Sequence, residues 1–190
     1  QAAGDPLTVA VNISAHSLLD AELPGHVAAM LDARGLPSSA LQLEITEEFL
    51  LVERELAHTI LTRLRNSGVT IAIDDFGTGY SSLAYLRDLP IDEIKLDNSF
   101  VIPMTHDART SALVSSTIKL AHSLGLRIVA EGVETAGAYT ELTRMGCDQA
   151  QGYFMSRPVP AADLNRWLHH WQALDQSADL PQLLPTTTHG

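Results

Sequence analysis

The chain has 190 residues, an apolar content of 45% and a formal net charge of −11 at pH 7. This length and composition are typical of one domain with a sizeable core, and the acidic balance argues against binding a nucleic acid polymer, which needs a basic face. A small phosphorylated ligand remains compatible with the acidic balance, because a bound metal ion can reverse the local field. Cys147 is the only cysteine, which excludes an internal disulfide and a zinc site built from cysteines.

Apolar strand patterns and helical patterns alternate along the chain. The expected strands cover residues 7–14, 41–46, 69–75, 92–97, 126–131 and 148–154. The expected helices cover residues 17–35, 52–66, 80–88, 108–124, 135–145 and 161–174. Pro24 and Gly25 should split the first of these helices. Six β units that alternate with helices predict an α/β fold with a parallel sheet and right-handed crossovers.

The polarity of the chain bears on the order of its C-terminal end and on its location in the cell. Residues 175–190 are polar and rich in Pro and Thr, so we expect a loosely ordered tail there. No apolar run approaches the length of a membrane span, and no signal peptide is visible. These patterns predict a cytoplasmic domain, whose parent protein could be anchored to the inner membrane by segments that this sequence does not contain.

The stretch from residue 70 to residue 86 carries the clearest signal for chemistry. Its β-branched run ends in two adjacent carboxylates, Asp74 and Asp75, and a glycine-rich loop follows. A continuous apolar run is typical of a strand buried on both faces, and charged residues cannot stay unpaired inside such a core. Both carboxylates should therefore lie at the C-terminal rim of the strand, where barrels and open α/β sheets place their chemistry. Alternatively, two Asp before a glycine can simply cap a turn and the next helix.

The other expected strands also end in polar residues. The whole set of polar strand ends comprises Asn12, Glu44, Asp74, Asp75, Lys95, Asp97, Glu131 and Gln151. Because the carboxyl ends of parallel strands meet at one edge, these side chains should converge. Oxygen ligands of this kind suit Mg²⁺ or Mn²⁺ better than zinc. Single residues also have structural alternatives: Asn12 can satisfy backbone groups, Lys95 can pair with Asp97, and Gln151 can be a polar strand end.

Six short motifs together resemble the EAL domain family. They are V-N-I-S at 11–14, L-E-I-T-E at 43–47, D-D-F-G-T-G-Y-S-S-L at 74–83, I-K-L-D at 94–97, V-A-E-G-V-E-T at 129–135 and Q-G-Y-F at 151–154. The resemblance implies an EAL domain within residues 1–174, folded as a modified TIM-type (β/α) barrel. It also implies a cyclic-guanylate-specific phosphodiesterase that hydrolyses cyclic di-GMP to linear pGpG with Mg²⁺ or Mn²⁺, two ions in the active form.

The same resemblance implies roles for individual residues. The implied metal ligands are Asn12, Glu44, Asp74, Asp75 and Glu131, and the implied catalytic residues are Lys95 and Glu131. The implied substrate-binding or supporting residues are Asp97, Gln151, Glu47 and Glu134. The active-site loop is formed by Phe76, Gly77, Thr78, Gly79, Tyr80, Ser81 and Ser82, and it resembles the undegraded loop of active members. As residues of a rim rather than of the core, Glu44, Asp74 and Lys95 should change the stability by no more than about 1 kcal/mol when substituted.

The chain departs from the family pattern in its extent. The Glu-Ala-Leu motif and the first two barrel strands are absent, so we expect the C-terminal portion of an EAL domain with about six of eight β units. This incomplete barrel should have weak activity or none, and the strands at 7–14 and 148–154 should form open edges. Open edges predict self-association, as a homodimer or larger species, or a cover formed by another chain or by the tail.

Two further questions stay open at the level of the sequence. Asn98 stands where the family commonly has Arg, with no evident consequence. A non-catalytic module that senses cyclic di-GMP or docks a partner is the alternative to an enzyme, and regulatory domains could precede this chain in the parent protein.

Overall fold

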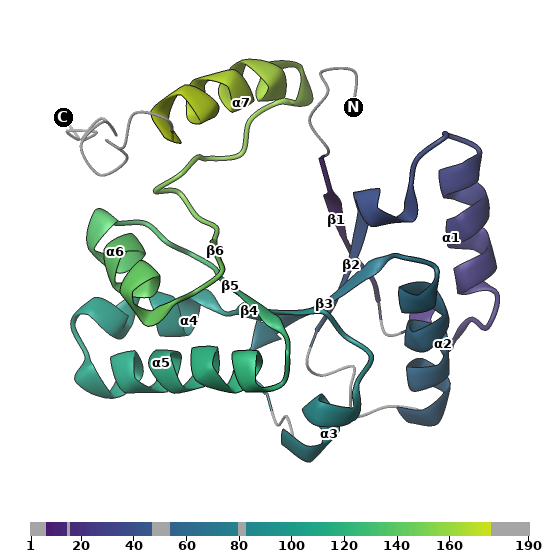
Figure 1. Cartoon of the computed structure of the whole chain (residues 1–190), viewed down its shortest axis with the longest axis horizontal. Helices are drawn as coiled ribbons and strands as arrows, with labels where there is room; N and C mark the ends of the chain where they lie inside the picture. The colour runs from purple at the N-terminus through teal and green to yellow at the C-terminus, as the bar shows by residue number, and fades with distance from the viewer. Residues whose placement is uncertain (1–6, 15, 47–53, 80–82, 176–190) are drawn as a thin grey trace.

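The fold is a parallel sheet of six strands with helices on its outer side. The computed structural model describes residues 7–14, 16–46, 54–79 and 83–175. The strands lie in the order of the sequence, from β1 to β6, and all neighbouring pairs are parallel. In Figure 1 the helices α1, α2, α3, α5 and α6 surround the curved sheet, and α7 lies apart from them at the top of the view. The predicted α/β architecture is confirmed as a six-stranded half-barrel.

The bounds of the elements follow the predicted alternation. The strands are β1 (Val9–Asn12), β2 (Leu41–Thr46), β3 (Thr70–Phe76), β4 (Glu93–Leu96), β5 (Arg127–Ala130) and β6 (Gln149–Ala150). The helices are α1 (Leu23–Asp32), α2 (Arg54–Asn66), α3 (Leu83–Asp88), α4 (Asn98–Val101), α5 (Ala108–Ser123), α6 (Ala136–Met145) and α7 (Ala161–Asp175). Short 3-10 turns in the described part of the chain are η1 (Ser17–Leu19), η2 (Ser38–Ala40) and η4 (Pro103–Thr105). No helix among the described residues is both long enough and apolar enough to cross a membrane.

Alternation along the strands divides apolar from polar side chains. The outward apolar residues of the central strands, which pack against the helices, are Leu43, Ile45, Ile71, Ile73, Ile94, Leu96 and Ile128. Their helical partners in the core include Ile60 and Leu64 of α2 and Val114 and Ile118 of α5, all nearly fully buried. Full burial of one such side chain contributes about 1.5–3 kcal/mol. The opposite face of the same strands therefore remains available for polar groups.

Two expected elements differ from the structure. The expected helix at 17–35 is split into η1 and α1, but the break lies before Leu23, and Pro24 and Gly25 both belong to α1. α1 ends before Gly35, whose φ is +60°. Pro24 lies in the first turn of α1, where its missing N–H costs nothing. The expected strand at 148–154 is reduced to Gln149–Ala150, because the N–H groups of Met155 and Ser156 both bond back to the carbonyl of Gly152 and turn the chain.

The sheet ends in two strands that pair on one side only within the described residues. β1 pairs with β2, and β6 pairs with β5. All four residues of β1 are exposed, with Val9 and Val11 at 60% and 43% of their full accessible surface. The open edges expected from the sequence are therefore present, whereas self-association remains a prediction.

Candidate active site at the carboxyl ends of the strands

The ammonium group of Lys95 is the centre of the candidate site. Its Nζ lies 2.8 Å from Oε1 of Glu44, 3.0 Å from Oδ1 of Asp74 and 2.7 Å from Oε1 of Glu131. Lys95 belongs to β4, Glu44 to β2 and Asp74 to β3, while Glu131 directly follows β5. Parallel pairing brings these positions to one end of the sheet, as the sequence predicted. Lys95 thus pairs with these three carboxylates in place of Asp97, which was the alternative partner.

Burial and pairing determine the protonation of this cluster. Burial alone would lower the pKa of Lys95, but its contacts with Glu131, Glu44 and Asp74 outweigh that effect and raise the pKa above the ordinary value. Burial also raises the pKa of Glu131, an effect that Lys95 opposes and that the charges of Asp74 and Glu44 reinforce. Lys95 is therefore a protonated donor at neutral pH, and Glu131 is a carboxylate whose proton affinity is increased.

Three carboxylates are close enough to share a cation. Ligand oxygens of Asp74, Asp75 and Glu131 lie within 4.8 Å of one another. Oδ1 of Asp74 is buried and has no hydrogen bond in correct geometry among the described residues, although it lies 3.0 Å from Nζ of Lys95. A carboxylate oxygen can accept at more than one lone pair, so coordination of a cation would add to its contact with Lys95. The donor set therefore fits a hard divalent cation.

Asp75 has an unusual backbone conformation. Its φ is +53°, and it is the one non-glycine residue with positive φ in the described part of the chain. Such conformations cost on the order of 1–3 kcal/mol and cluster at functional sites. Burial and the neighbouring charges of Asp74 and Asp97 raise the pKa of the Asp75 carboxyl. A cation bound here would offset that repulsion.

The remaining expected site residues vary in how the structure places them. Asn12 is the parallel partner of Glu44 and lies on the exposed edge strand. Asp97 caps α4, where its side chain accepts the N–H of Ser99 at 3.0 Å. Gln151 and Glu134 are exposed in the segments that follow β6 and β5. In the active-site loop, Phe76, Gly77, Thr78 and Gly79 are described, while Glu47, Tyr80, Ser81 and Ser82 lie outside the described residues.

We expected Glu44 and Lys95 to be residues of a rim rather than of the core, and this expectation is wrong. Glu44 and Lys95 are only 7% and 5% exposed. They face the interior of the curved sheet, where β2 and β4 are flanked by neighbours on both sides. Breaking a buried ion pair by removing one partner is strongly destabilising, so these residues contribute to stability as well as to the candidate site.

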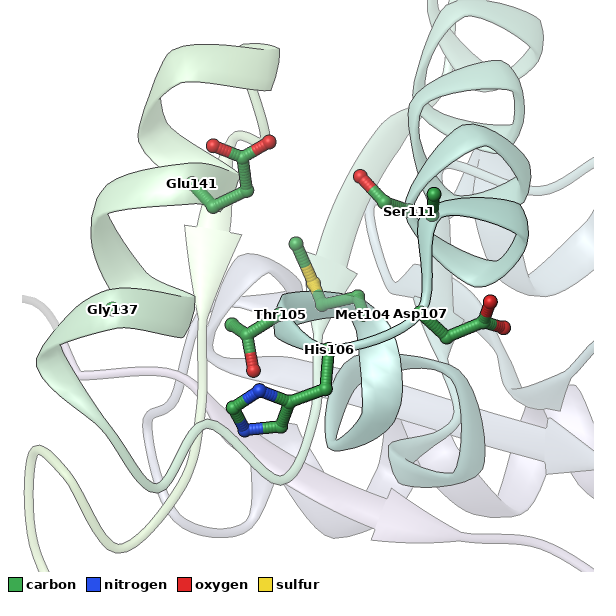
Figure 2. Close-up of a pocket in the computed structure, with 8 residues that line it drawn as sticks. Met104, Thr105, His106, Asp107, Ser111, Gly137 and Glu141 are labelled. Atoms are coloured by element: carbon green, nitrogen blue, oxygen red, sulfur yellow. The ribbon is translucent and has the colours of Figure 1, made fainter.

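A separate hollow lies on the outer side of the sheet. Figure 2 shows it between α6 and the start of α5, with Met104 of η4 at its base. Its volume is about 520 Å³, and its lining includes His106, Ser111 and Glu141. Glu141 is paired with Arg144, two of whose nitrogens lie 2.6 and 3.0 Å from its carboxylate oxygens. None of the candidate site residues lines this hollow.

The comparison with known proteins decides the family. The model of the EAL domain family matches residues 1–158. The chain belongs to the EAL domain family. This EAL chain is 43% identical over 166 residues to the cyclic di-GMP phosphodiesterase NbdA of Pseudomonas aeruginosa, covering 87% of this chain and 21% of NbdA.

Two solved structures of related proteins are similar to this chain in fold and sequence. The structure of the phosphodiesterase MucR of P. aeruginosa in complex with c-di-GMP matches with a TM-score of 0.78 and 44% identity, over 83% of this chain and 64% of that one. The manganese and cyclic di-GMP complex of BlrP1 from Klebsiella pneumoniae matches with a TM-score of 0.74 and 34% identity, over 80% of this chain and 39% of that one. The EAL chain thus spans about a fifth of the curated relative NbdA and under two thirds of both structures.

Sequence reasoning missed one polar layer inside the EAL half-barrel. Glu93 is 2% exposed and lies two residues before Lys95 on β4, so both point to the same face. Oε1 of Glu93 accepts a hydrogen bond from Nε2 of Gln42 at 2.6 Å, and Oε2 lies 3.2 Å from an Arg127 guanidinium nitrogen. The spacing of two residues from Lys95 on the same strand could have indicated in the sequence that Glu93 shares its face.

Proposed function

We propose that this EAL chain supplies metal ligands and proton-transfer groups for the hydrolysis of cyclic di-GMP to linear pGpG. The observation that carries the proposal is the cluster of Glu44, Asp74 and Glu131 around the buried ammonium of Lys95, with Asp75 beside it. The names of NbdA and MucR as phosphodiesterases of this dinucleotide support the substrate.

The proposed ion is Mg²⁺ or Mn²⁺, with two ions in the active form. Asp74, Asp75 and Glu131, together with Asn12 and Glu44, would hold these ions. The carboxylate and amide oxygens of this set are the ligands that hard divalent cations prefer, and the manganese complex of BlrP1 supports the choice. When bound, such ions polarise phosphate oxygens and make water a better nucleophile near neutral pH.

Lys95 and Glu131 have complementary roles in this proposal. Because Lys95 is held protonated, it acts as a hydrogen-bond donor to the attacking water or to a phosphate oxygen, not as a base. Glu131 accepts the proton of the attacking water, since its raised proton affinity favours that transfer. The P–O bond to the ribose oxygen breaks as the new P–O bond forms, and the departing ribose oxygen takes up a proton from solvent to become a hydroxyl, which opens the ring and gives pGpG.

Further parts of the proposal concern the chain as a whole. We propose an EAL domain unit within residues 1–174 and a separate tail at 175–190, in a cytoplasmic protein that carries regulatory segments elsewhere. The chain itself should be a weak enzyme, because Asn12 and Glu44 lie at or next to an open edge of the sheet. A non-catalytic cyclic di-GMP sensor is the competing function.

The two functions are separated by a comparison of two chains. One is the chain of 190 residues, and the other extends it N-terminally by about 60 residues, toward the usual length of a TIM barrel. Each is incubated with cyclic di-GMP and Mn²⁺, and pGpG is quantified by chromatography. The proposal expects pGpG from the extended chain at a rate higher by orders of magnitude. Tight binding of cyclic di-GMP by the extended chain without any pGpG would favour the sensor.

A further inference from the structure

The short helix α4 lies directly after the strand that carries Lys95. Asp97 caps this helix by accepting the N–H of Ser99, and the N–H of Phe100 bonds to the carbonyl of Asp97 at 3.1 Å. Val101, the last residue of α4, is fully buried in the core. The helix is therefore fixed at both ends, although it has only four residues.

Two side chains of α4 contact glycine turns on the two strands that flank β4. Gly77 follows β3 with φ +102°, and a Cβ placed on it would lie 2.7 Å from Cε2 of Phe100. Gly132 follows β5 with φ +69°, and a Cβ there would lie 2.4 Å from Cβ of Asn98. Real Cβ atoms do not approach so closely, so both turns rest directly on α4.

These two turns carry the candidate metal ligands. Gly77 lies two residues after Asp75, and Gly132 directly follows Glu131. Asp75 has a strained φ of +53°, and its carbonyl accepts bonds from the N–H and the hydroxyl of Thr78 at 3.3 and 2.9 Å. A strained residue persists only when its surroundings hold it in place. The ring of Phe100 behind Gly77 is such a support.

We infer that α4 is a spacer that sets the distance between the Asp74–Asp75 pair and Glu131, with Phe100 and Asn98 as positioning residues. This inference rests on the proposed function of the carboxylate cluster. Ligands of a metal ion must be held within about 0.5 Å of their productive positions by the residues behind them. Phe100 holds the turn after β3, and the Cβ of Asn98 holds the turn after β5. The length of α4 therefore sets the distance between these two turns.

The test measures Mn²⁺ affinity by calorimetry and the thermal midpoint in parallel on the full chain. Phe100→Ala should weaken Mn²⁺ binding by about 10–100-fold, the usual effect of losing a support behind a ligand. Ile102→Ala, at a 52% exposed side chain directly after α4, is the matched control, and its Mn²⁺ affinity should stay within about twofold of that of the unsubstituted chain. Leu142→Ala, at a buried residue of α6, should lower the thermal midpoint without changing the Mn²⁺ affinity.

A pair of substitutions tests the contact itself. Gly77→Ala should weaken Mn²⁺ binding, and the loss should be smaller in a Phe100→Leu background, where the ring atoms that the new methyl group would meet are gone. Equal losses in both backgrounds would overturn the inference, as would unchanged affinity in Phe100→Ala. If Phe100→Ala does not fold, this pair decides the question alone. Absence of Mn²⁺ binding in the unsubstituted chain would instead contradict the proposed function.

Discussion

Nζ of Lys95 lies 2.7 Å from Oε1 of Glu131. The two residues come from neighbouring strands, since Leu96 pairs with Ala130 in the register of β4 and β5. This contact joins a lysine whose pKa is raised by its three carboxylate neighbours, against the effect of burial, to a glutamate whose pKa is raised by burial. A donor and a proton acceptor are thus fixed side by side before any ligand arrives.

Replacing the buried cation should destabilise the metal-free chain. Lys95→Met keeps the volume of the side chain but leaves Glu44, Asp74 and Glu131 facing one another without a counter-charge. The expected loss is about 3–5 kcal/mol in the free energy of unfolding, the usual effect of breaking a buried ion pair. Urea unfolding in the presence of a chelator measures this loss. Addition of Mn²⁺ should recover more stability in the variant than in the unsubstituted chain, and equal recovery would argue against a shared cation site.

Mn²⁺ should raise the thermal midpoint through the carboxylate cluster. A ligand at about 100 times its dissociation constant stabilises the folded state by about 2.7 kcal/mol. Asp74→Asn should remove most of this shift, because it replaces one of the three carboxylates that are close enough to share a cation. Asp163→Asn, on the exposed helix α7, is the control and should keep the full shift. A shift that survives Asp74→Asn would place the ion elsewhere.

Asp148 should make the free energy of unfolding depend on pH. Burial raises the pKa of Asp148, but the N–H of Ile128 at 2.8 Å and His122 at 3.0 Å outweigh it, so the net pKa is lowered. A lowered pKa in the folded state gives stability that is present above the unfolded value of about 3.9 and is lost as the pH falls through the folded value. Because the Asp148 side chain is 35% exposed, the contribution should stay below about 1 kcal/mol.

Unfolding between pH 6 and pH 3 measures this contribution. Asp148→Asn should be less stable than the unsubstituted chain at pH 6, and the difference should shrink toward pH 3. A difference that is constant over this range would mean that the ionised carboxylate is not the cause.

The exposed edge strand should make the chain self-associate. Val9 and Val11 present apolar side chains on β1, whose outer edge has no neighbour among the described residues. A lysine on an edge strand opposes edge-to-edge pairing, so Val11→Lys should lower the apparent mass in light scattering at tens of micromolar protein. Met30→Lys, at an equally exposed apolar residue on α1, should leave the mass unchanged. A monomeric unsubstituted chain with a cooperative melt would refute the prediction.

The convergence of Glu44, Asp74, Lys95 and Glu131 could be predicted from the sequence because two simple rules act together. Apolar strand patterns identified the central strands, and parallel strands carry their carboxyl ends to one edge. The family resemblance then named the chemistry. The position of each residue relative to its strand was enough, although the pairing of β3 with β4 shifts in register between Ile73 and Phe76.

Other features depend on contacts that a sequence pattern does not contain. A four-residue helix such as α4 has too few turns for a hydrophobic period, so its support of Gly77 through Phe100 was not visible. The φ of Asp75 and the shortening of β6 depend on turn geometry after the strands. The burial of Lys95 depends on strands that flank it on both sides, whereas the sequence pattern indicated a rim.

The most direct test of the account is the production of pGpG from cyclic di-GMP by the N-terminally extended chain and its Lys95→Met variant, each with Mn²⁺ and with a chelator. The account predicts pGpG only from the unsubstituted chain with Mn²⁺. Loss of a group that positions the attacking water should reduce turnover by at least about 100-fold. Turnover that persists in Lys95→Met, or in the presence of the chelator, would contradict the account.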